Sequence, residues 1–163
     1  LALPCQRLVL ESERFQFTID AFATRIAETP PSGGVASTPE LPLETTIQAQ
    51  LIGASLWRSS DLFVLSARYQ DGDVQQIASV GLASRLPLGN AWRIGPRLRV
   101  DRRESTIDAA VETIYVPSLR IDYQRGATWF EFEGGAELGK RVIPAEDEKS
   151  TRYYFSLGYR INF

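Results

Sequence analysis

The chain has 163 residues, enough for one domain, and its 18 Lys and Arg nearly balance 20 Asp and Glu. This balance gives no broad positive surface for nucleic acid. The chain has no histidine and a single cysteine, which excludes histidine-dependent nucleophilic catalysis and an internal disulfide. No eighteen apolar residues run together, so no transmembrane helix is expected. A membrane-spanning β-barrel is not excluded, because its strands need only about nine to eleven residues that are apolar on one face.

Cys5 follows the residues Leu1 to Pro4. The segment resembles a bacterial lipoprotein cleavage site, but Pro4 stands where a small residue is expected. We therefore interpret Cys5 as an incidental thiol. No basic and apolar secretory signal stands ahead of it, and we expect a mature chain or a segment of a longer precursor.

Eight segments alternate between apolar and polar residues with a period of two, the pattern of strands with one apolar face. The pattern is weaker in the first two segments and in the fourth. In chain order the expected strands are 15–23, 47–57, 63–70, 78–86, 92–101, 115–124, 129–138 and 152–163. Pro96 and Pro117 fall on the apolar face of two of them, and we interpret both as bulge or strand-end positions, because proline removes a ladder hydrogen bond.

The last expected strand has the clearest alternation. Five of its apolar residues fall at every second position up to the final residue, with only Tyr154 on the wrong face. In water such an apolar face would be unusual, whereas against lipid it is expected. The residues concerned, with Tyr153 before them, are Phe155, Leu157, Tyr159, Ile161 and Phe163.

Between the strands, tight turns are expected at 58–61, 87–91 and 124–127. Longer polar links are expected at 27–44, 102–112 and 140–150, with one short link of the same set at 70–73. Short turns at one rim and long loops at the other are typical of an up-and-down membrane barrel.

Aromatic residues of the apolar face gather at strand ends, and small or aliphatic residues occupy the middles. This arrangement predicts two aromatic girdles around an apolar band. Beside the tight turns the girdle residues are Trp57, Phe63, Trp92, Tyr123 and Phe130, and at the other rim they are Tyr69, Tyr115 and Tyr153.

Three segments, 86–104, 115–126 and 151–163, resemble the C-terminal barrel of Gram-negative outer-membrane proteins that carry tetratricopeptide repeats in front of it. The resemblance implies passage or export of polymers, notably exopolysaccharide, through the outer membrane. It also implies that Phe155, Leu157, Tyr159, Ile161 and Phe163 form the signal read by the barrel-assembly machinery. The chain itself contains no helical repeat of about 34 residues.

The face opposite the apolar one is charged, and it is expected to line the barrel interior. Its main residues are Arg93, Arg97, Arg99, Arg120, Glu131, Glu133, Arg152 and Arg160. These charges either neutralise one another, for instance with Arg120 directly opposite Glu131, or form a basic ladder of Arg93, Arg97 and Arg99 that guides an anionic solute. We favour the first interpretation.

Glu131 and Glu133 could also act as a carboxylate pair for glycoside hydrolysis. No aromatic stacking residues, phosphate-binding glycine loop or metal-ligand cluster accompany them. We therefore expect no catalytic residues, no metal and no cofactor, and a protein that is not an enzyme.

The sequence predicts a single all-β domain over 1–163: a transmembrane antiparallel up-and-down β-barrel with eight strands. It is either a complete small barrel or the closing part of a larger one that pairs with further strands or another chain. We expect it in the bacterial outer membrane, in contact with lipid and lipopolysaccharide, with both termini periplasmic. Its role would be structural or transport. Alternatives are a narrow barrel that binds a surface partner through long loops, and a soluble lipocalin-like binder.

Overall fold

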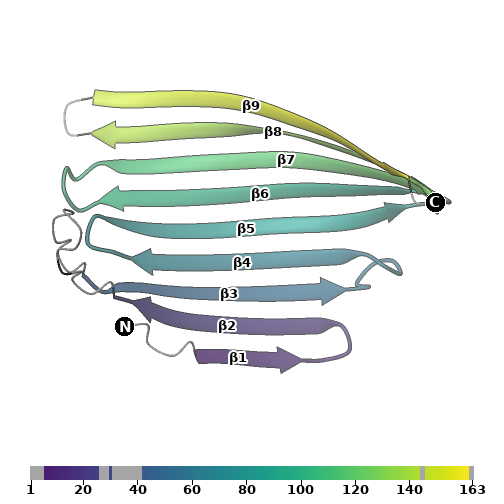
Figure 1. The fold of residues 1–163 in the computed structure, drawn as a ribbon, viewed down its shortest axis with the longest axis horizontal. Helices are drawn as coiled ribbons and strands as arrows, with labels where there is room; N and C mark the ends of the chain where they lie inside the picture. Colours follow the sequence, from purple (N-terminus) through teal and green to yellow (C-terminus); the bar gives the residue numbers. More distant parts are fainter. Residues whose placement is uncertain (1–5, 26–29, 31–41, 144–145, 162–163) are drawn as a thin grey trace.

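The computed structural model describes residues 6–25, 30, 42–143 and 146–161. These residues form nine strands and no helix (Figure 1). The strands are β1 (Gln6–Glu11), β2 (Phe15–Thr24), β3 (Glu44–Ala54), β4 (Leu62–Asp71), β5 (Gln75–Leu88), β6 (Trp92–Ser105), β7 (Val111–Arg125), β8 (Thr128–Ile143) and β9 (Glu146–Ile161).

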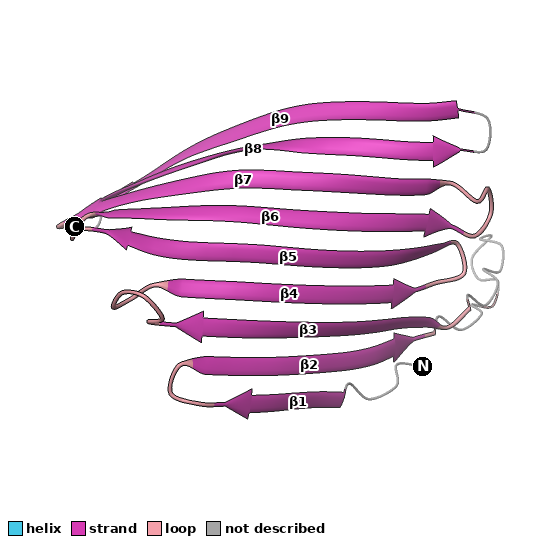
Figure 2. Ribbon diagram, turned by 180° about the vertical axis from the view of Figure 1, so that it is seen from behind, coloured by secondary structure: helices cyan, strands magenta, loops and turns pink. Residues whose placement is uncertain are grey.

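The nine strands form one sheet in sequence order, and every neighbouring pair is antiparallel (Figure 2). The prediction of an all-β, up-and-down antiparallel fold is therefore confirmed. The sheet is open, because β1 pairs only with β2 and β9 only with β8 among the described residues. The expectation of eight strands closing into a barrel by themselves is wrong for this structure.

β1 is the strand that the sequence did not predict, and the eight predicted segments correspond to β2 through β9. We call the edge with the links β1–β2, β3–β4, β5–β6 and β7–β8 rim 1, and the opposite edge rim 2. Because nine is odd, Gln6 lies at rim 2 and Ile161 at rim 1 (Figure 1). The expectation that both ends share a rim depended on an even strand count.

The strands are longer than predicted, and they replace most of the expected long loops. β6 and β7 leave only 106–110 as their link, and β8 and β9 together run through all of 140–150 except 144–145, which lie outside the described residues. At rim 1 the β3–β4 link, 55–61, is in turn longer than the expected tight turn. Most of the link 27–44 lies outside the described residues, and the other links do not sort by length between the rims.

Two of the tight turns are explained by glycine. Gly126 has a φ of 57° at the first position of the two-residue link between β7 and β8, and Gly89 has a φ of 68° at the start of the β5–β6 link. Positive φ at these positions is readily available only to glycine.

Pro96 and Pro117 lie inside β6 and β7 with no change of register, so the expectation of bulges or strand ends is wrong. Between β6 and β7 each proline has a paired partner, Leu119 and Leu98 respectively. Each proline lacks an N–H group, and the hydrogen bond is missing on the other side of its strand. Pairing of β5 with β6 skips Ser84 and Arg85, and pairing of β7 with β8 skips Val116 and Pro117.

The described sheet has almost no hydrophobic core. Its only buried apolar residues are Ala110 and Ile114, and no large side chain is fully buried. The apolar residues instead form one continuous exposed face, and the polar residues form the other face.

Candidate functional site: the concave polar face

The buried residues of the strands lie on the polar face of the sheet. Thr18, Thr46, Asp101 and Asp122 are 4–7% exposed, and all four belong to the register positions of that face. The large exposed apolar residues of the strands belong, with three exceptions (Val9, Phe22 and Tyr154), to the other face. The carboxylates of the polar face are thus sheltered and their arginine partners are partly exposed, while Leu, Phe and Tyr side chains of the other face are exposed. This is the inverse of a sheet that packs on a hydrophobic core.

The polar face is concave. A cavity of about 270 Å³ is lined jointly by residues from β4 to β9, including Val64, Arg97, Glu133 and Tyr154. Strands lie about 4.8 Å apart, so side chains separated by five strand spacings share one cavity only where the sheet curves around it. The apolar face is therefore the convex one.

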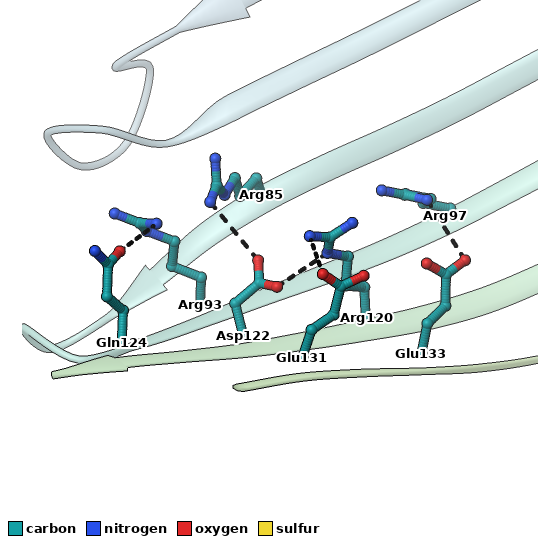
Figure 3. Close-up of polar contacts among 8 residues, drawn as sticks. All are labelled: Arg85, Arg93, Arg97, Arg120, Asp122, Gln124, Glu131 and Glu133. Carbon is teal, nitrogen blue, oxygen red and sulfur yellow. Dashed lines mark hydrogen bonds and ion pairs between the residues drawn. The ribbon is translucent and has the colours of Figure 1, made fainter. Parts of the chain in front are cut away.

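A chain of charged contacts crosses the concave face from β5 to β8 (Figure 3). Arg85 lies 3.7 Å from Asp122, Asp122 accepts a hydrogen bond of 3.0 Å from Arg120, and Arg120 donates one of 2.8 Å to Glu131. Arg120 also lies over the Trp129 ring, 6.0 Å from its centroid. Asp122 is almost completely buried and is held by two arginines, which compensates its loss of water.

The predicted pair of Arg120 and Glu131 is present, but its register differs. The β7–β8 turn consists of Gly126 and Ala127, which places Glu133 directly opposite Arg120. Arg120 reaches Glu131 diagonally, one side-chain step along the same face. Glu133 pairs instead with Arg97, at 3.5 Å.

The predicted basic ladder is largely compensated. Arg97 pairs with Glu133 at 3.5 Å and Arg99 with Asp101 at 3.1 Å, while Arg93 donates to the Gln124 amide oxygen at 3.4 Å (Figure 3). The arrangement supports the interpretation that these charges neutralise one another. Glu131 and Glu133 are each held by an arginine, and the structure brings no free carboxylate pair together at this position.

Arg152 and Arg160 stand apart from this network, on β9. In register Arg152 faces Glu137 and Arg160 faces Trp129, and neither forms an ion pair with a described residue. They are two separate positive charges on the concave side of the β9 edge, which also carries Glu148 nearer rim 2.

The larger cavity, about 540 Å³, lies on the concave face over β1 to β6. Its lining is dominated by hydroxyl, amide and guanidinium groups, with Asp20 and Asp101 held by Arg7 at 3.3 Å and Arg99 at 3.1 Å. The sequence predicted that the charged residues Asp20, Arg68, Arg99 and Asp101 of this lining face the interior, but it did not single out the hydroxyl and amide residues, because the alternation in 15–23 and 47–57 is weak. The polar lining residues include Thr18, Gln48, Gln50, Ser66, Arg68, Gln70 and Ser79.

Tyr154, the one exception to the alternation of β9, packs over a glycine. It lies opposite Gly135 in register, and a Cβ built on Gly135 would approach the Tyr154 hydroxyl to 2.6 Å. The ring thus fills the space that the glycine leaves on the concave face. In the sequence this contact is indicated only by Tyr154, an aromatic residue that breaks the alternation of apolar and polar residues.

The predicted girdle residues beside rim 1 lie together on the convex face. Trp57 and Phe63 pack edge to face with centroids 5.4 Å apart, and Trp92, Tyr123 and Phe130 follow at 4.6 and 6.5 Å. Tyr159 continues the row as the register partner of Phe130. The sequence assigned Tyr159 to the terminal signal alone.

The rim 2 row is oblique to the hydrogen-bond direction, whereas the rim 1 row follows one register line from β6 to β9 through Trp92, Tyr123, Phe130 and Tyr159. On rim 2, Tyr153 in β9 lies four residues nearer rim 1 than Lys149, which shares the register line of Tyr69 in β4. On rim 1, Tyr159 is displaced equally from Phe155, on the line of Phe63. On rim 2 a shift of about 13 Å over five strand spacings of about 4.8 Å is an inclination of about 30°. On rim 1 the whole displacement falls between β4 and β6. Tyr115 lies between Tyr69 and Tyr153 in this progression.

Beyond the rim 2 aromatics the convex face becomes charged. The register line of Tyr69 continues through Arg102, Thr113, Lys140 and Lys149. Arg102 pairs with Glu104 at 2.6 Å, and Lys140 with Asp147 at 3.2 Å. The strands β6 to β9 therefore extend past the apolar band with polar residues on both faces.

The residues of the predicted assembly signal project from the convex side of β9. Phe155, Leu157 and Tyr159 are 76–83% exposed, and Ile161 is also exposed. Phe163 lies outside the described residues.

The β3–β4 link is organised by Asp61, which is 2% exposed. Its carboxylate accepts hydrogen bonds from the backbone N–H groups of Leu56, Trp57 and Arg58 at 2.8–2.9 Å. Burial works to raise the pKa of Asp61, but these bonds and one associated with Ser55 outweigh it, and the pKa lies below the ordinary value. Asp61 thereby fixes the backbone that presents Trp57.

Asp108 has a similar role in the β6–β7 link. The hydrogen bond with the Ser105 hydroxyl, the N–H of Ala110 and the Arg141 guanidinium at 3.3 Å lower the pKa of Asp108. Both links are therefore structured by a carboxylate.

The described residues contain no group of three or more potential ligand residues placed to hold a metal ion. They also contain no helix that is long and apolar enough to cross a bilayer. Comparison with protein-family models, with curated proteins and with solved structures finds no match for this chain. The resemblance to barrels that follow tetratricopeptide repeats therefore stays a prediction.

Proposed function

We propose that this sheet is part of the wall of a membrane-spanning β-barrel of the bacterial outer membrane, with a structural or transport role. The observation that carries the proposal is the inversion of the sheet. Its convex face is a continuous apolar surface, and its concave face is polar, sheltered and ion-paired. Exposed apolar patches of this extent are not tolerated on soluble monomers, and lipid is the environment that suits a convex one.

The oblique aromatic row at rim 2 supports the same proposal. In a membrane barrel the strands tilt by about 35–45°, so girdles that follow the bilayer surfaces must run obliquely to the hydrogen bonds. The rim 2 row shifts in one direction from Tyr69 through Tyr115 to Tyr153, and the separation of the two rows is equal on β4 and β9. A preference of aromatic residues for strands explains their presence but not this slope.

The two alternatives lack comparable support. A surface-binding role depended especially on long loops at 27–44 and 140–150. The structure has strands at 140–143 and 146–150, and most of 27–44 lies outside the described residues. A lipocalin-like binder needs an apolar concave face, whereas the concave face here carries arginines and carboxylates.

The test is refolding of the chain into lipid vesicles, with Leu157→Cys and Ser156→Cys variants in a Cys5→Ser background. The two positions are adjacent on β9 and face opposite sides. A fluorophore on position 157 should be quenched by brominated lipid chains and one on 156 by aqueous iodide. Equal iodide quenching at both positions, with protein that stays soluble without detergent, would reject the membrane wall.

Conductance of the refolded chain in planar bilayers separates the two roles. Stable current steps support transport along the concave face. Vesicle-embedded but silent protein supports a structural role.

A further inference from the structure

β9 is a sixteen-residue strand at the edge of the sheet, and inside a membrane this edge would need a neighbouring strand. Its outer side pairs with no described residue, and its convex side chains are the most exposed of any strand. Within a bilayer each unpaired backbone amide or carbonyl costs several kcal/mol. The edge must therefore be covered wherever the sheet spans a membrane.

The direction of the two edge strands restricts what can cover them. β1 and β9 are separated by eight antiparallel steps, so both run from rim 2 to rim 1. Direct closure of β9 onto β1 would thus be a parallel pairing. A second copy inserted in the same direction would also present its β1 in parallel to β9, and β9 to β9 pairing would need two copies inserted in opposite directions.

We propose that the β9 edge takes an antiparallel strand that is supplied neither by β1 nor by a second copy, and that an odd number of such strands completes the wall. This inference rests on the proposed function. It follows from antiparallel pairing, which connects β9 to β1 only through one, three, five or more intervening strands.

The side chains at the edge define the chemistry of the adjoining strand. On the convex side it must be apolar, because it continues the surface of Phe155 and Leu157. On the concave side, level with the two aromatic rows, it must present carboxylates, because the β9 charges there are Arg152 and Arg160 and neither has an ion-pair partner among the described residues. Glu148 is on the same side of β9 but lies beyond the rim 2 row. The adjoining strand would therefore have about ten residues, with acidic residues on its concave side.

A synthetic strand can test this chemistry with the full chain in detergent micelles. The probe is a peptide with alternating Leu on one face and Glu opposite Arg152 and Arg160, and the control peptide has Lys at the two Glu positions. The Glu peptide should slow hydrogen exchange of β9 amides, and the Lys peptide should bind about tenfold more weakly. In an Arg152→Gln, Arg160→Gln variant the difference between the two peptides should disappear. Equal binding of both peptides to the unaltered chain would overturn the acidic partner.

Closure by the chain itself is tested with spin labels at Leu8→Cys and Leu157→Cys in a Cys5→Ser background. Adjacent strands would place these backbones about 5 Å apart. A short distance within one chain would show self-closure, and a short distance between chains would show a second copy, and either overturns the proposal. If the chain fails to enter lipid in the quenching experiment, the proposed function fails first and independently.

Discussion

Arg97 in β6 and Glu133 in β8 form an ion pair of 3.5 Å across the intervening strand β7. Their strands are two spacings apart, about 9.6 Å, and only small Ser118 stands between them as the register partner of Arg97. The concave curvature of the sheet brings these two side chains closer together. The pair therefore reports on curvature as well as on charge.

Exchange of these two charges should reveal their coupling. Arg97→Glu and Glu133→Arg should each lower the free energy of unfolding in detergent micelles, and the double exchange should recover about 0.5–1 kcal/mol of the summed loss. The value is modest because Arg97 is partly exposed. Urea titration followed by heat-modifiable gel mobility measures it. Arg152→Gln is the control and should show no coupling with Glu133→Arg. Strict additivity of the Arg97 and Glu133 exchanges would contradict the pair.

A charge placed on the convex face should be costly only if that face contacts lipid. Leu157→Arg should destabilise the refolded protein in vesicles by about 2–4 kcal/mol, as arginine does near the middle of a bilayer. The matched change Ser156→Arg, on the concave face, should have a much smaller effect. Unfolding by guanidinium in vesicles gives both values. An unchanged free energy of unfolding in Leu157→Arg would indicate that water, and not lipid, covers this face.

Gly135 should not tolerate a side chain. A methyl group there would meet the Tyr154 ring at 2.6–2.7 Å and the Pro117 carbonyl at 2.8 Å, so Gly135→Ala should cost about 1–3 kcal/mol. Gly158→Ala is the control on the next strand, where the nearest atom is 3.7 Å away in ordinary contact. Both variants can be compared by thermal gel shift. Equal stability of the two would show that Tyr154 does not occupy the space above Gly135.

The order of the β3–β4 link should depend on pH through Asp61. Because the folded-state pKa of Asp61 lies below its ordinary value of 3.8, its contribution is complete above that value and is lost as the pH falls through the lower folded-state pKa. Trp57 fluorescence anisotropy should therefore fall as the solution is acidified below about pH 4. Asp61→Asn should lower the anisotropy at neutral pH and flatten the profile. An unchanged profile in Asp61→Asn would assign the transition to another group.

The sequence predicted the two faces because each is set locally. Wherever one face is apolar and the other is polar, the period of two places Leu65, Leu98 or Phe132 on one side and Arg97 or Glu133 on the other. The positions of these residues in the structure follow that alternation. The pairing of Arg97 with Glu133 could not be predicted in this way, because it depends on curvature across three strands.

The errors share a physical cause. Strand ends beyond the apolar band carry polar residues on both faces. The segments 140–143 and 146–150 therefore show no alternation, and the sequence predicted a loop there. β1 was missed because Leu8, Val9 and Leu10 run together and give no period of two. Closure could not be read from the sequence, because it depends on the parity of the strands and on what meets their edges.

Pro96 and Pro117 leave two gaps in the backbone pairing of the sheet. One lies between β5 and β6 and the other between β7 and β8, while β6 and β7 stay paired to each other throughout. The β6–β7 hairpin is thus joined to β5 and to β8 by ladders that each contain one gap of two residues. Within these two ladders, separation of the strands under lateral strain should begin at the gaps.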